Sequence, residues 1–572
     1  MKNKFYLFMI ISIVFISFGF YQINRPDEEE IKQNTEVGTL SPIKWYSMIS
    51  TSINEKDLEV VVDNEYMDDY FGDAVMDENL SINIPYESAK ELFDCSVLLY
   101  NNKKLVLRRD GKEVTAKVSK DYFKLDGKKI ELDNKLYYDD SNHLYVPLEL
   151  YEKAFLYESR WDDNNNTIIL TCKNTDERKL PDKYCLLDDE RLKNEARDQS
   201  LYGTCWAFAG IGALETSLLP EENYDFSEDH ASVNNVYGRD QGDGGQYTIL
   251  WSYLASWKGP VLEKDDPYGD GKTRKKLKSI KHVQEMQIIP SKDTEKIKDA
   301  VYRYGGVQSS LYISMEHLNE DNEYYNSIAC SYCYKGTSKS NHDVYIIGWD
   351  DNFPKEKFNS NVKSDGAFIC RNSWGSSFGD NGNFYVSYED ANIGTYNEVY
   401  TKVDDNDNFD NIYEYDECGW CGTLGFTHSE EAFAANVYTA KSDEVLKAVS
   451  FYATVPNTEY ELYICPEFKG TASLLDGKQI CKKGKIKNSG YYTIRCEDAD
   501  LKAGSKYAVV MKIKTPDSTK PIAVECTNDL VDKVVKLNEG EGYYSIDGIK
   551  WESAEDSECN ICLKAFTDDK EN

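Results

Sequence analysis

The chain has 572 residues, and its 66 lysines and arginines against 100 aspartates and glutamates give a formal net charge of −34. This length favours about three domains, and 41% hydrophobic residues supply packed cores, which excludes a mainly disordered acidic protein. Such a charge repels phosphate backbones, and the chain shows no basic footprint, so nucleic acid is excluded as a partner. The excess of carboxylates suits a soluble protein that works outside the cell.

The N-terminus has the pattern of an export signal. It begins Met1-Lys-Asn-Lys, continues with an apolar run over residues 5–21 and reaches an acidic stretch at Asp27–Glu30. A positive start followed by an apolar core is typical of exported proteins. The run is long for a cleaved signal and short for a membrane helix, so residues 1–24 are expected to be a signal peptide or a membrane anchor. Either one places the rest of the chain outside the cell or at its surface.

Residues 25–179 are predicted to form a small β-rich module. Short alternating segments such as Leu105-Val-Leu-Arg are separated by Asp-Gly turns, and one helix is expected at Ser88–Phe93. The strand–helix start at Ile82–Leu92 and the Tyr145-Val-Pro-Leu stretch resemble the copper-amine-oxidase N-terminal-like domain of many exported bacterial proteins. The resemblance implies a stalk or a pro-region, and implies neither copper nor oxidase activity.

The most informative stretch is Gln199-Ser-Leu-Tyr-Gly-Thr-Cys, in which Cys205 opens a predicted helix that runs to about Leu219. The helix is apolar almost all round, so we expect it to be buried at the centre of its domain. A thiol at its N-terminus lies in the positive end of the helix dipole, which favours the thiolate. Gly203 lets the chain turn sharply before the helix, and the upstream Gln199 is placed to point back across that turn.

Two further residues stand in matching contexts downstream. His342 begins the strand pattern His-Asp-Val-Tyr-Ile-Ile-Gly-Trp, and Asn372 precedes Ser-Trp-Gly. In this order, and with these neighbours, the chain resembles the papain-like cysteine peptidases. The resemblance implies that Cys205 is the nucleophile, that His342 is its base and later the acid, and that Asn372 orients His342. It also implies that Gln199 and the Cys205 N–H form the oxyanion hole, and that Trp374 shields the His342–Asn372 hydrogen bond.

The resemblance extends to substrate-binding residues. The segment Gln-Gly-Asp-Gly-Gly resembles the family's glycine motif, so Gly244 and Gly245 are expected to line the cleft, with Gly245 hydrogen-bonding the substrate backbone. Asp343 stands at a position that borders the S2 pocket in the family. Trp374 is the fourth residue that the resemblance assigns to substrate binding. Residues 180–398 are therefore expected to form an α+β papain-like domain with a helical lobe and a β-barrel-like lobe. The resemblance implies protein or peptide substrates and no cofactor.

The chain departs from the family pattern in three ways. Tyr202 and Gly242 stand where the family usually has cysteines, so the disulfide beside the active site is expected to be absent. Sixteen residues, 350–365, are inserted between the His and Asn strands and change the shape of that loop. No helical inhibitory propeptide of the usual type is recognisable between residues 25 and 180. The sequence thus leaves open how activity is restrained.

After an acidic linker at residues 399–410, residues 411–572 are predicted to form a β-sandwich. Alternating segments such as Ala448-Val-Ser-Phe and Tyr507-Ala-Val-Val recur at short spacing. Together with Asn560-Ile-Cys-Leu, they resemble the lectin-like domain that follows a papain-like domain in some exported bacterial and archaeal peptidases. The resemblance suggests contact with cell-envelope carbohydrate, and a sandwich that only packs against the catalytic domain is an equal alternative.

Three cysteine pairs have the CxxC spacing, namely Cys330/Cys333, Cys418/Cys421 and Cys559/Cys562. The spacing suits zinc, but each pair stands apart in the sequence and lacks supporting residues, so no metal is assigned. Disulfides and reduced thiols both stay open. The total of fifteen cysteines is odd, which leaves at least one thiol unpaired within the chain.

Two competing functions stand beside the peptidase. One is a surface adhesin whose peptidase domain has lost activity, and the other is a Cys–His acyltransferase or peptidoglycan hydrolase. Without the neighbouring motif residues, a cysteine such as Cys205 is more often a buried structural thiol than a nucleophile, and a histidine on a strand such as His342 is more often a core residue. Agreement among four site positions in family order favours the peptidase over the adhesin. The Asn-Ser-Trp-Gly and Gly-Gly motifs favour it over the acyltransferase.

Overall fold

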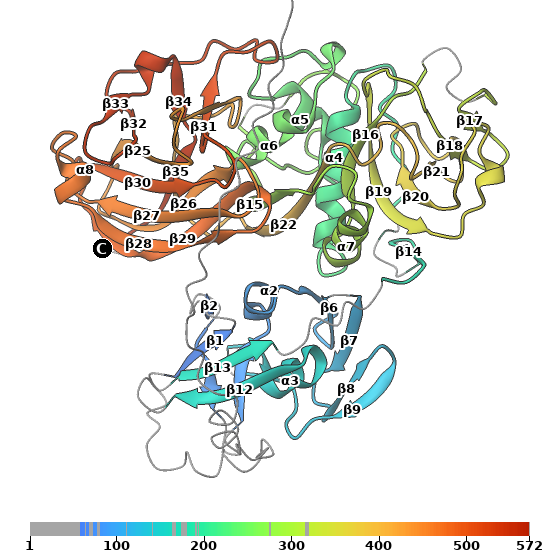
Figure 1. Cartoon of the computed structure of the whole chain (residues 1–572), viewed down its shortest axis with the longest axis horizontal. Coiled ribbons are helices and arrows are strands. Elements are labelled where there is room, and N and C mark those ends of the chain that lie inside the picture. Colours follow the sequence, from blue (N-terminus) through green and yellow to red (C-terminus); the bar gives the residue numbers. More distant parts are fainter. Residues whose placement is uncertain are drawn as a thin grey trace, which may run out of the picture.

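The computed structural model describes residues 58–570, apart from gaps at 63–64, 68–71, 77–80, 110, 140, 163–166, 173–179, 189–191, 193, 274–275 and 315–319. The signal or anchor predicted at residues 1–24 lies outside the described residues. Within the described part, no helix is long and apolar enough to cross a membrane. Three bodies of structure follow one another along the chain, coloured blue to teal, green to yellow, and orange to red in Figure 1.

The N-terminal body is built from short strands, as the alternating segments predict. Its elements are β1 (Glu59–Val62), β2 (Glu65–Tyr66), β3 (Val75–Met76), β4 (Ile82–Pro85), α2 (Ser88–Leu92), β5 (Ser96–Tyr100), β6 (Lys104–Arg109), β7 (Lys112–Lys117), β8 (Tyr122–Leu125), β9 (Lys128–Glu131), β10 (Tyr137–Tyr138), β11 (Leu144–Pro147), α3 (Leu148–Phe155), β12 (Tyr157–Asp162) and β13 (Thr167–Cys172). They form three sheets, ordered β12-β13-β1-β2, β10-β11-β4-β3 and β5-β6-β7-β8-β9. Phe93 stacks on Tyr151 in the shared core, with ring centroids 4.2 Å apart. The predicted β-rich N-terminal domain is confirmed.

The central body contains the predicted helix at Cys205. Its elements are β14 (Lys183–Cys185), α4 (Cys205–Leu218), α5 (Glu228–Val233), η3 (Gln241–Asp243), α6 (Tyr247–Ala255), β15 (Lys281–Ile288), α7 (Thr294–Tyr304), β16 (Val307–Leu311), β17 (Tyr325–Asn326), β18 (Ser331–Tyr332), β19 (His342–Asp350), η4 (Lys355–Lys357), β20 (Ala367–Arg371), β21 (Asn383–Ser387) and β22 (Asn397–Asp405). Helices α4, α5 and α6 form one lobe, and the sheet around β19 forms the other (Figure 1). The predicted two-lobed α+β architecture is confirmed.

Helix α4 lies at the junction of the two lobes because both of its sides are apolar and buried. Two glycines permit this close packing. A Cβ on Gly210 would lie 2.2 Å from Leu250 of α6, and one on Gly212 would lie 2.6 Å from Tyr345 of β19. The helix can therefore approach both neighbours, which fixes its N-terminus at the lobe junction.

The C-terminal body is the predicted β-sandwich. Its elements are β23 (Asn411–Tyr413), β24 (Gly422–Leu424), β25 (Glu431–Thr439), β26 (Glu444–Ala453), β27 (Thr458–Cys465), α8 (Ser473–Asp476), β28 (Gln479–Ile486), β29 (Ser489–Leu501), β30 (Lys506–Lys514), β31 (Ile522–Cys526), β32 (Gly542–Ser545), β33 (Glu552–Ser553), η5 (Glu555–Ser557), β34 (Cys559–Ile561) and β35 (Leu563–Asp569). A six-stranded sheet, ordered β28-β27-β30-β25-β32-β33, faces strands β29, β26, β35 and β23 across a common apolar core. The alternating apolar residues fill that core, as expected for a sandwich.

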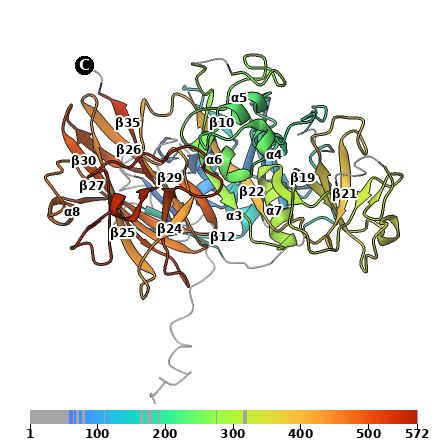
Figure 2. The ribbon, with the colours of Figure 1, turned by 90° about the horizontal axis from the view of Figure 1, so that it is seen from above.

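One sheet runs through both the central and the C-terminal bodies. In the described chain this 13-stranded sheet continues from β22 through β15 into β29. Glu285 of β15 pairs with Tyr492 of β29, and Ile288 pairs with Ser489. Residues 399–405 of the expected acidic linker belong to β22, whose first five residues, 397–401, are buried and whose last two are the aspartates that begin the Asp and Asn cluster. The two bodies are thus joined by backbone hydrogen bonds, and Figure 2 shows them side by side.

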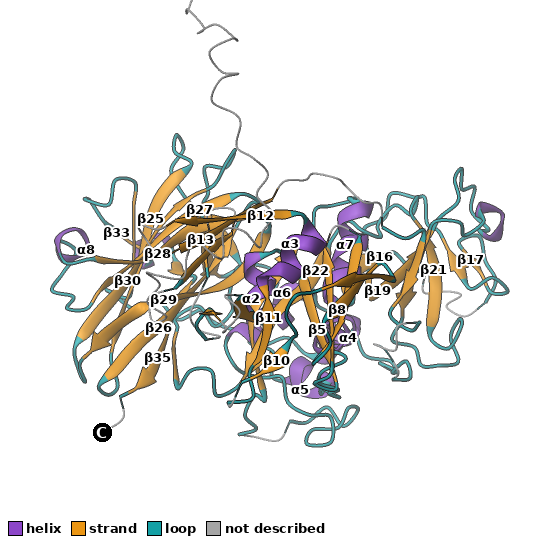
Figure 3. Cartoon of the chain, turned by 90° about the horizontal axis from the view of Figure 1, so that it is seen from below, coloured by secondary structure: helices purple, strands orange, loops and turns teal. Residues whose placement is uncertain are grey.

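The N-terminal body packs against the α7 side of the central body (Figures 1 and 3). Arg303 of α7 donates to both the backbone oxygen and the carboxylate of Asp94, each at 2.6 Å. The same carboxylate pairs with Lys487 of the C-terminal body at 3.1 Å. Arg108 reaches between Tyr184 and Tyr302, donating to the Tyr184 hydroxyl at 3.0 Å. All three bodies therefore meet at this contact.

Candidate active site

The candidate nucleophile lies where a loop meets the central helix. Cys205 is the first residue of α4, and the turn before it is tight, since a Cβ on Gly203 would lie 2.9 Å from the Gly244 nitrogen. Burial and then the nearby Asp343 carboxylate raise the pKa of the Cys205 thiol to about 12, although backbone hydrogen bonds from Asp343, Trp206 and Cys205 lower it. The expectation of a resting thiolate therefore differs from the structure, because burial outweighs the helix N-terminus.

His342 and Asn372 meet because they end neighbouring antiparallel strands. His342 begins β19, Asn372 follows β20, and the two strands pair. His342 Nε2 lies 2.8 Å from Asn372 Oδ1, which also accepts the Ser373 N–H at 2.8 Å. Since this oxygen can only accept, Nε2 must carry the proton, and Nδ1 is left as a base.

The imidazole is enclosed by an aromatic ring. The Trp374 ring lies against His342, with centroids 4.9 Å apart and the planes tilted by 32°. Burial lowers the pKa of His342 to about 4, although the hydrogen bond with Asn372 raises it. His342 is therefore neutral at pH 7 and able to accept a proton. The backbone of Asp343, the residue that follows His342 on β19, hydrogen-bonds the Cys205 sulfur, which brings the thiol to the end of β19 that carries His342.

Gln199 is held in place by Ser373. The Gln199 N–H donates to the Ser373 carbonyl at 2.8 Å, and the Ser373 hydroxyl donates to Gln199 Oε1 at 2.5 Å. Gln199 Nε2 donates to the Tyr202 carbonyl at 2.7 Å. An amide nitrogen carries two N–H groups, so this geometry turns the amide nitrogen toward the loop that precedes Cys205.

The glycine motif at residues 241–245 packs against the residues that flank the thiol. The Gly203 N–H donates to the Gln241 carbonyl at 2.9 Å. A Cβ on Gly245 would lie 2.5 Å from Trp206 Nε1, and Gly244 has a φ of 71°. Glycine is required at both positions, at Gly245 for space and at Gly244 for its backbone conformation.

Asp343 does not point freely into solvent. Its carboxylate accepts from Ser310 at 2.6 Å and from Gln308 at 3.0 Å, both on β16. Burial raises the pKa of Asp343 to about 6, against these two hydrogen bonds. Glu398 of β22 lies opposite Gln308 and is 1% exposed, and burial together with the Asp343 charge raises its pKa.

The structure brings all the predicted site residues to one junction between the lobes, namely Gln199, Cys205, Gly244, Gly245, His342, Asp343, Asn372 and Trp374. Sequence reasoning missed Ser373 and Glu398, together with a buried ion cluster behind the site. In that cluster Arg197 contacts Glu215 at 2.7 Å and Glu228 at 2.5 Å, which anchors the segment leading to Gln199. The sequence signal for this cluster was Glu215, an acidic residue in the otherwise apolar helix α4, which requires a buried cationic partner.

The described residues contain no group of three or more His, Cys, Asp or Glu side chains arranged to hold a metal ion. The structure records its fifteen cysteines, those of the CxxC pairs included, as free thiols.

Comparison with protein-family models divides the chain into the same three bodies. The copper amine oxidase N-terminal domain matches residues 61–170, the papain family cysteine protease matches residues 181–403, and the lectin like domain matches residues 412–567. The central domain is a papain-family cysteine peptidase domain. Residues 412–567 are called the lectin-like domain below.

Curated relatives match the papain-like domain. Cathepsin L 1 of Paramecium tetraurelia is 30% identical over 213 residues, which are 36% of this chain and 59% of that protein. Cathepsin S of Bos taurus is 28% identical over 251 residues, or 41% of this chain and 66% of that protein. The chain thus spans less than two thirds of the length of these relatives.

Two solved structures share the papain-like and lectin-like pair. The cysteine protease and lectin-like domains of Cwp84, a surface layer associated protein of Clostridium difficile, superpose with a TM-score of 0.59 at 27% identity, covering 69% of this chain and 90% of that one. Cwp84 after propeptide cleavage gives a TM-score of 0.60 at 28% identity, covering 68% and 99%. The joined architecture of the two domains is therefore shared with Cwp84.

Proposed function

We propose that the chain is an exported cysteine endopeptidase that hydrolyses peptide bonds. The observation that carries this proposal is the buried hydrogen bond of 2.8 Å between His342 Nε2 and Asn372 Oδ1, at the end of β19 where the Asp343 backbone contacts the Cys205 sulfur. The arrangement leaves a neutral imidazole nitrogen next to a thiol at the N-terminus of a helix, which is the requirement for base-assisted thiol attack.

The reaction follows from these groups. As Cys205 attacks the peptide carbonyl, its proton passes to His342 Nδ1, and Asn372 holds the imidazole through Nε2. The Cys205 N–H and the free N–H of Gln199 Nε2 stabilise the oxyanion. Collapse of this intermediate breaks the C–N bond, and His342 returns the proton to the leaving amine. Water, activated by His342, then hydrolyses the thioester and releases the acid product.

We place the enzyme at the cell surface. Cwp84, which shares the paired domains, is a surface layer associated protein, and the N-terminal sequence has the pattern of a signal or anchor. The lectin-like domain suggests contact with cell-envelope carbohydrate. Cell fractionation tests this location by comparing where the full chain is found with where a chain lacking residues 1–24 is found.

Specificity is proposed to depend on buried carboxyls at the S2 side of the cleft. The Asp343 carboxylate there, with Glu398 nearby, favours a basic or polar side chain at P2. A peptide library read with wild type and Asp343→Ala checks this. Aliphatic or aromatic preference that is unchanged in the variant contradicts it.

Peptide hydrolysis by the full chain tests the proposed activity, with Cys205→Ala as the inactive variant and Cys330→Ala as a control for loss of a partly buried thiol. We expect Cys205→Ala to remove all cleavage and Cys330→Ala to retain it. Cleavage of peptidoglycan but of no peptide would favour the hydrolase alternative. Absence of any reaction would favour the silent adhesin.

A further inference from the structure

The loop that carries Gly244 and Gly245 lies between the candidate nucleophile and the lectin-like domain. On one side it rests on the residues around Cys205, through the Gly203–Gln241 hydrogen bond and the Gly245–Trp206 contact described above. On the other side it faces the C-terminal body. We define residues 239–245 as the glycine segment.

A loop of the lectin-like domain holds the chain that leads into this segment. The backbone N–H groups of Asp532 and Lys533 both donate to the Tyr237 carbonyl, at 2.9 Å each. The Asp532 carboxylate lies 3.9 Å from Arg239, and Arg239 Nη2 donates to the Asp243 carbonyl at 3.1 Å. A continuous polar path therefore runs from the lectin-like domain to the residue before Gly244.

An apolar anchor supports the same loop. Val531 is 5% exposed and belongs to an apolar cluster that joins papain-like residues such as Tyr237 to lectin-like residues such as Tyr452. The loop is therefore packed into the apolar contact between the two domains.

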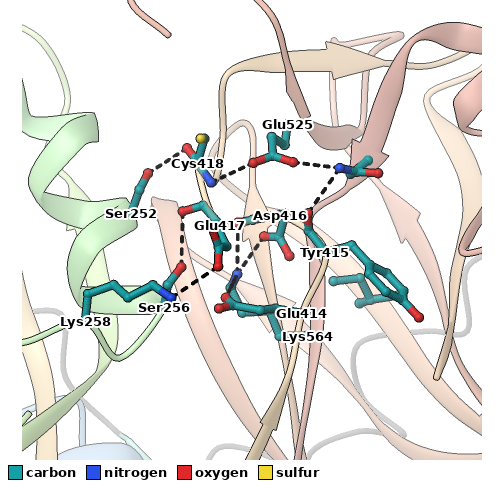
Figure 4. Close-up of polar contacts among 12 residues, drawn as sticks. Ser252, Ser256, Lys258, Glu414, Tyr415, Asp416, Glu417, Cys418, Glu525 and Lys564 are labelled. Atoms are coloured by element: carbon teal, nitrogen blue, oxygen red, sulfur yellow. Dashed lines mark hydrogen bonds and ion pairs between the residues drawn. The ribbon is translucent and has the colours of Figure 1, made fainter. Parts of the chain in front are cut away.

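A second contact holds the chain that leaves the segment. Helix α6 begins at Tyr247, and Ser252 within it and Lys258 just after it reach the strap of residues 414–418 in Figure 4. Ser252 Oγ donates to the Cys418 carbonyl at 2.7 Å, and Lys258 pairs with Glu417 at 3.1 Å. Glu417 also pairs with Lys533, so the two contacts are joined within the lectin-like domain.

The strap is itself fixed by a buried ion cluster. Lys564, which is 1% exposed, pairs with Glu414 at 2.7 Å and with Asp416 at 2.9 Å (Figure 4). The Cys418 N–H donates to Glu525 at 2.7 Å. Partners buried in this way restrict the strap to one position, so the chain before the glycine segment at Tyr237 and the helix α6 after it both contact the same fixed part of the lectin-like domain.

We propose that the lectin-like domain positions the glycine segment for peptide substrates, and that Glu417, Val531 and Asp532 are positioning residues for substrate binding. The proposal rests on the peptidase function proposed above. His342 and Asn372 are held separately, because His342 begins β19 and Asn372 follows its neighbour β20. Loosening the lectin-like contact therefore weakens substrate binding and leaves the chemical step intact.

The test is a steady-state comparison of the full chain with the triple variant Glu417→Gln, Val531→Ala, Asp532→Asn. We expect KM for a peptide of several residues to rise about fivefold or more, because about one hydrogen bond to the substrate backbone is lost. We expect kcat to change less than about twofold. Alkylation of Cys205 by iodoacetamide, which is too small to use the glycine segment, is expected to keep its rate. Glu461→Gln is the matched control, since it removes a lectin-like carboxylate that pairs with Lys512 at 3.3 Å.

The outcomes separate the two proposals. A KM that rises in the triple variant but not in Glu461→Gln, with an unchanged rate of Cys205 alkylation, supports the positioning role of the lectin-like domain. An unchanged KM in a folded triple variant, with only a lower melting temperature, means that the contact is purely structural and overturns the proposal. A wild-type chain that is alkylated at Cys205 but cleaves no peptide removes the proposed function first, and the positioning role with it.

Discussion

At the scale of single residues, the resting site holds two neutral groups. The Cys205 thiol has its pKa raised to about 12 by burial and by Asp343, and His342 has its pKa lowered to about 4 by burial. At neutral pH the proton is therefore on sulfur and the imidazole is free to accept it. His342 loses this capacity only below about pH 4, so we expect activity to persist through mildly acidic pH.

Replacing Asp343 by Asn should make Cys205 more reactive. Above its pKa of about 6, Asp343 is ionised, and its charge opposes the thiolate. Asn removes the charge and keeps an oxygen for the hydrogen bond from Ser310. We expect iodoacetamide to alkylate the variant several-fold faster than wild type at pH 7.5, by less than about tenfold, since one pKa unit is a tenfold change in thiolate.

The pH dependence supplies the control for this prediction. At pH 5 Asp343 is protonated in the wild type, so the two proteins should react at similar rates. An equal ratio at pH 5 and pH 7.5 would show that the substitution acts through packing rather than charge.

At the scale of elements, the parts of the fold with strong local patterns were predictable. The apolar run at Cys205 specified α4, and alternation from His342 specified β19, since periodicity reports which faces are buried. The eight candidate site residues were predicted from family motifs at these two elements, at the glycine motif of residues 241–245 and at Asn-Ser-Trp-Gly after β20. Ser373 and Glu398 were missed because their roles depend on β20 and β22 reaching the site from distant positions in the chain, which no local pattern reports.

The pairing of β15 with β29 was also beyond the sequence. An edge strand does not show in its own residues which chain segment will cover it. For the same reason the residues of β22 read as an acidic linker although they belong to the central sheet. The separate sandwich was predictable, and its continuity with the papain-like domain was not.

Two free cysteines contact each other between the two sheets of the sandwich. Cys481 of edge strand β28 and Cys496 of β29 have side chains in hydrogen-bond contact, and the two strands belong to different sheets. We expect oxidised glutathione to convert them to a disulfide, with two reduced thiols released from glutathione. Closing this short loop should raise the melting temperature by about 5 °C.

Peptide mapping by mass spectrometry, without reduction, checks the bridge. The Cys481→Ser variant should lose both the cross-linked peptide and the rise in melting temperature, and Cys95→Ser should lose neither. Full alkylation of Cys481 and Cys496 after the oxidising treatment would contradict the prediction.

At the scale of the whole molecule, the N-terminal domain packs at the end of α4 that is remote from Cys205. It contacts Glu221 just after α4 and Tyr302 and Arg303 at the end of α7, and the 14 residues of α4 span about 20 Å. This placement favours an N-terminal domain that supports the papain-like domain over one that blocks the active-site cleft.

Asp94→Ala should therefore loosen the docking of the N-terminal domain without activating or inactivating the enzyme. The change removes the ion pairs with Arg303 and Lys487. We expect hydrogen exchange at the end of α7 to become at least about tenfold faster, the effect of about 1.4 kcal/mol of lost protection, with kcat/KM within about twofold. Asp121→Ala, on an exposed turn of the same domain, is the control. A many-fold rise in kcat/KM for Asp94→Ala would show instead that the docked domain restrains the site.

The most direct measurement of the central claim is covalent labelling of the full chain by an epoxide cysteine-peptidase probe, followed by mass spectrometry. We predict one equivalent of probe on Cys205, lost in Cys205→Ala and slowed at least about a hundredfold in His342→Ala, because the base is removed. Labelling that persists in Cys205→Ala, or no labelling of the folded wild-type chain, would contradict the account of this site as a cysteine peptidase.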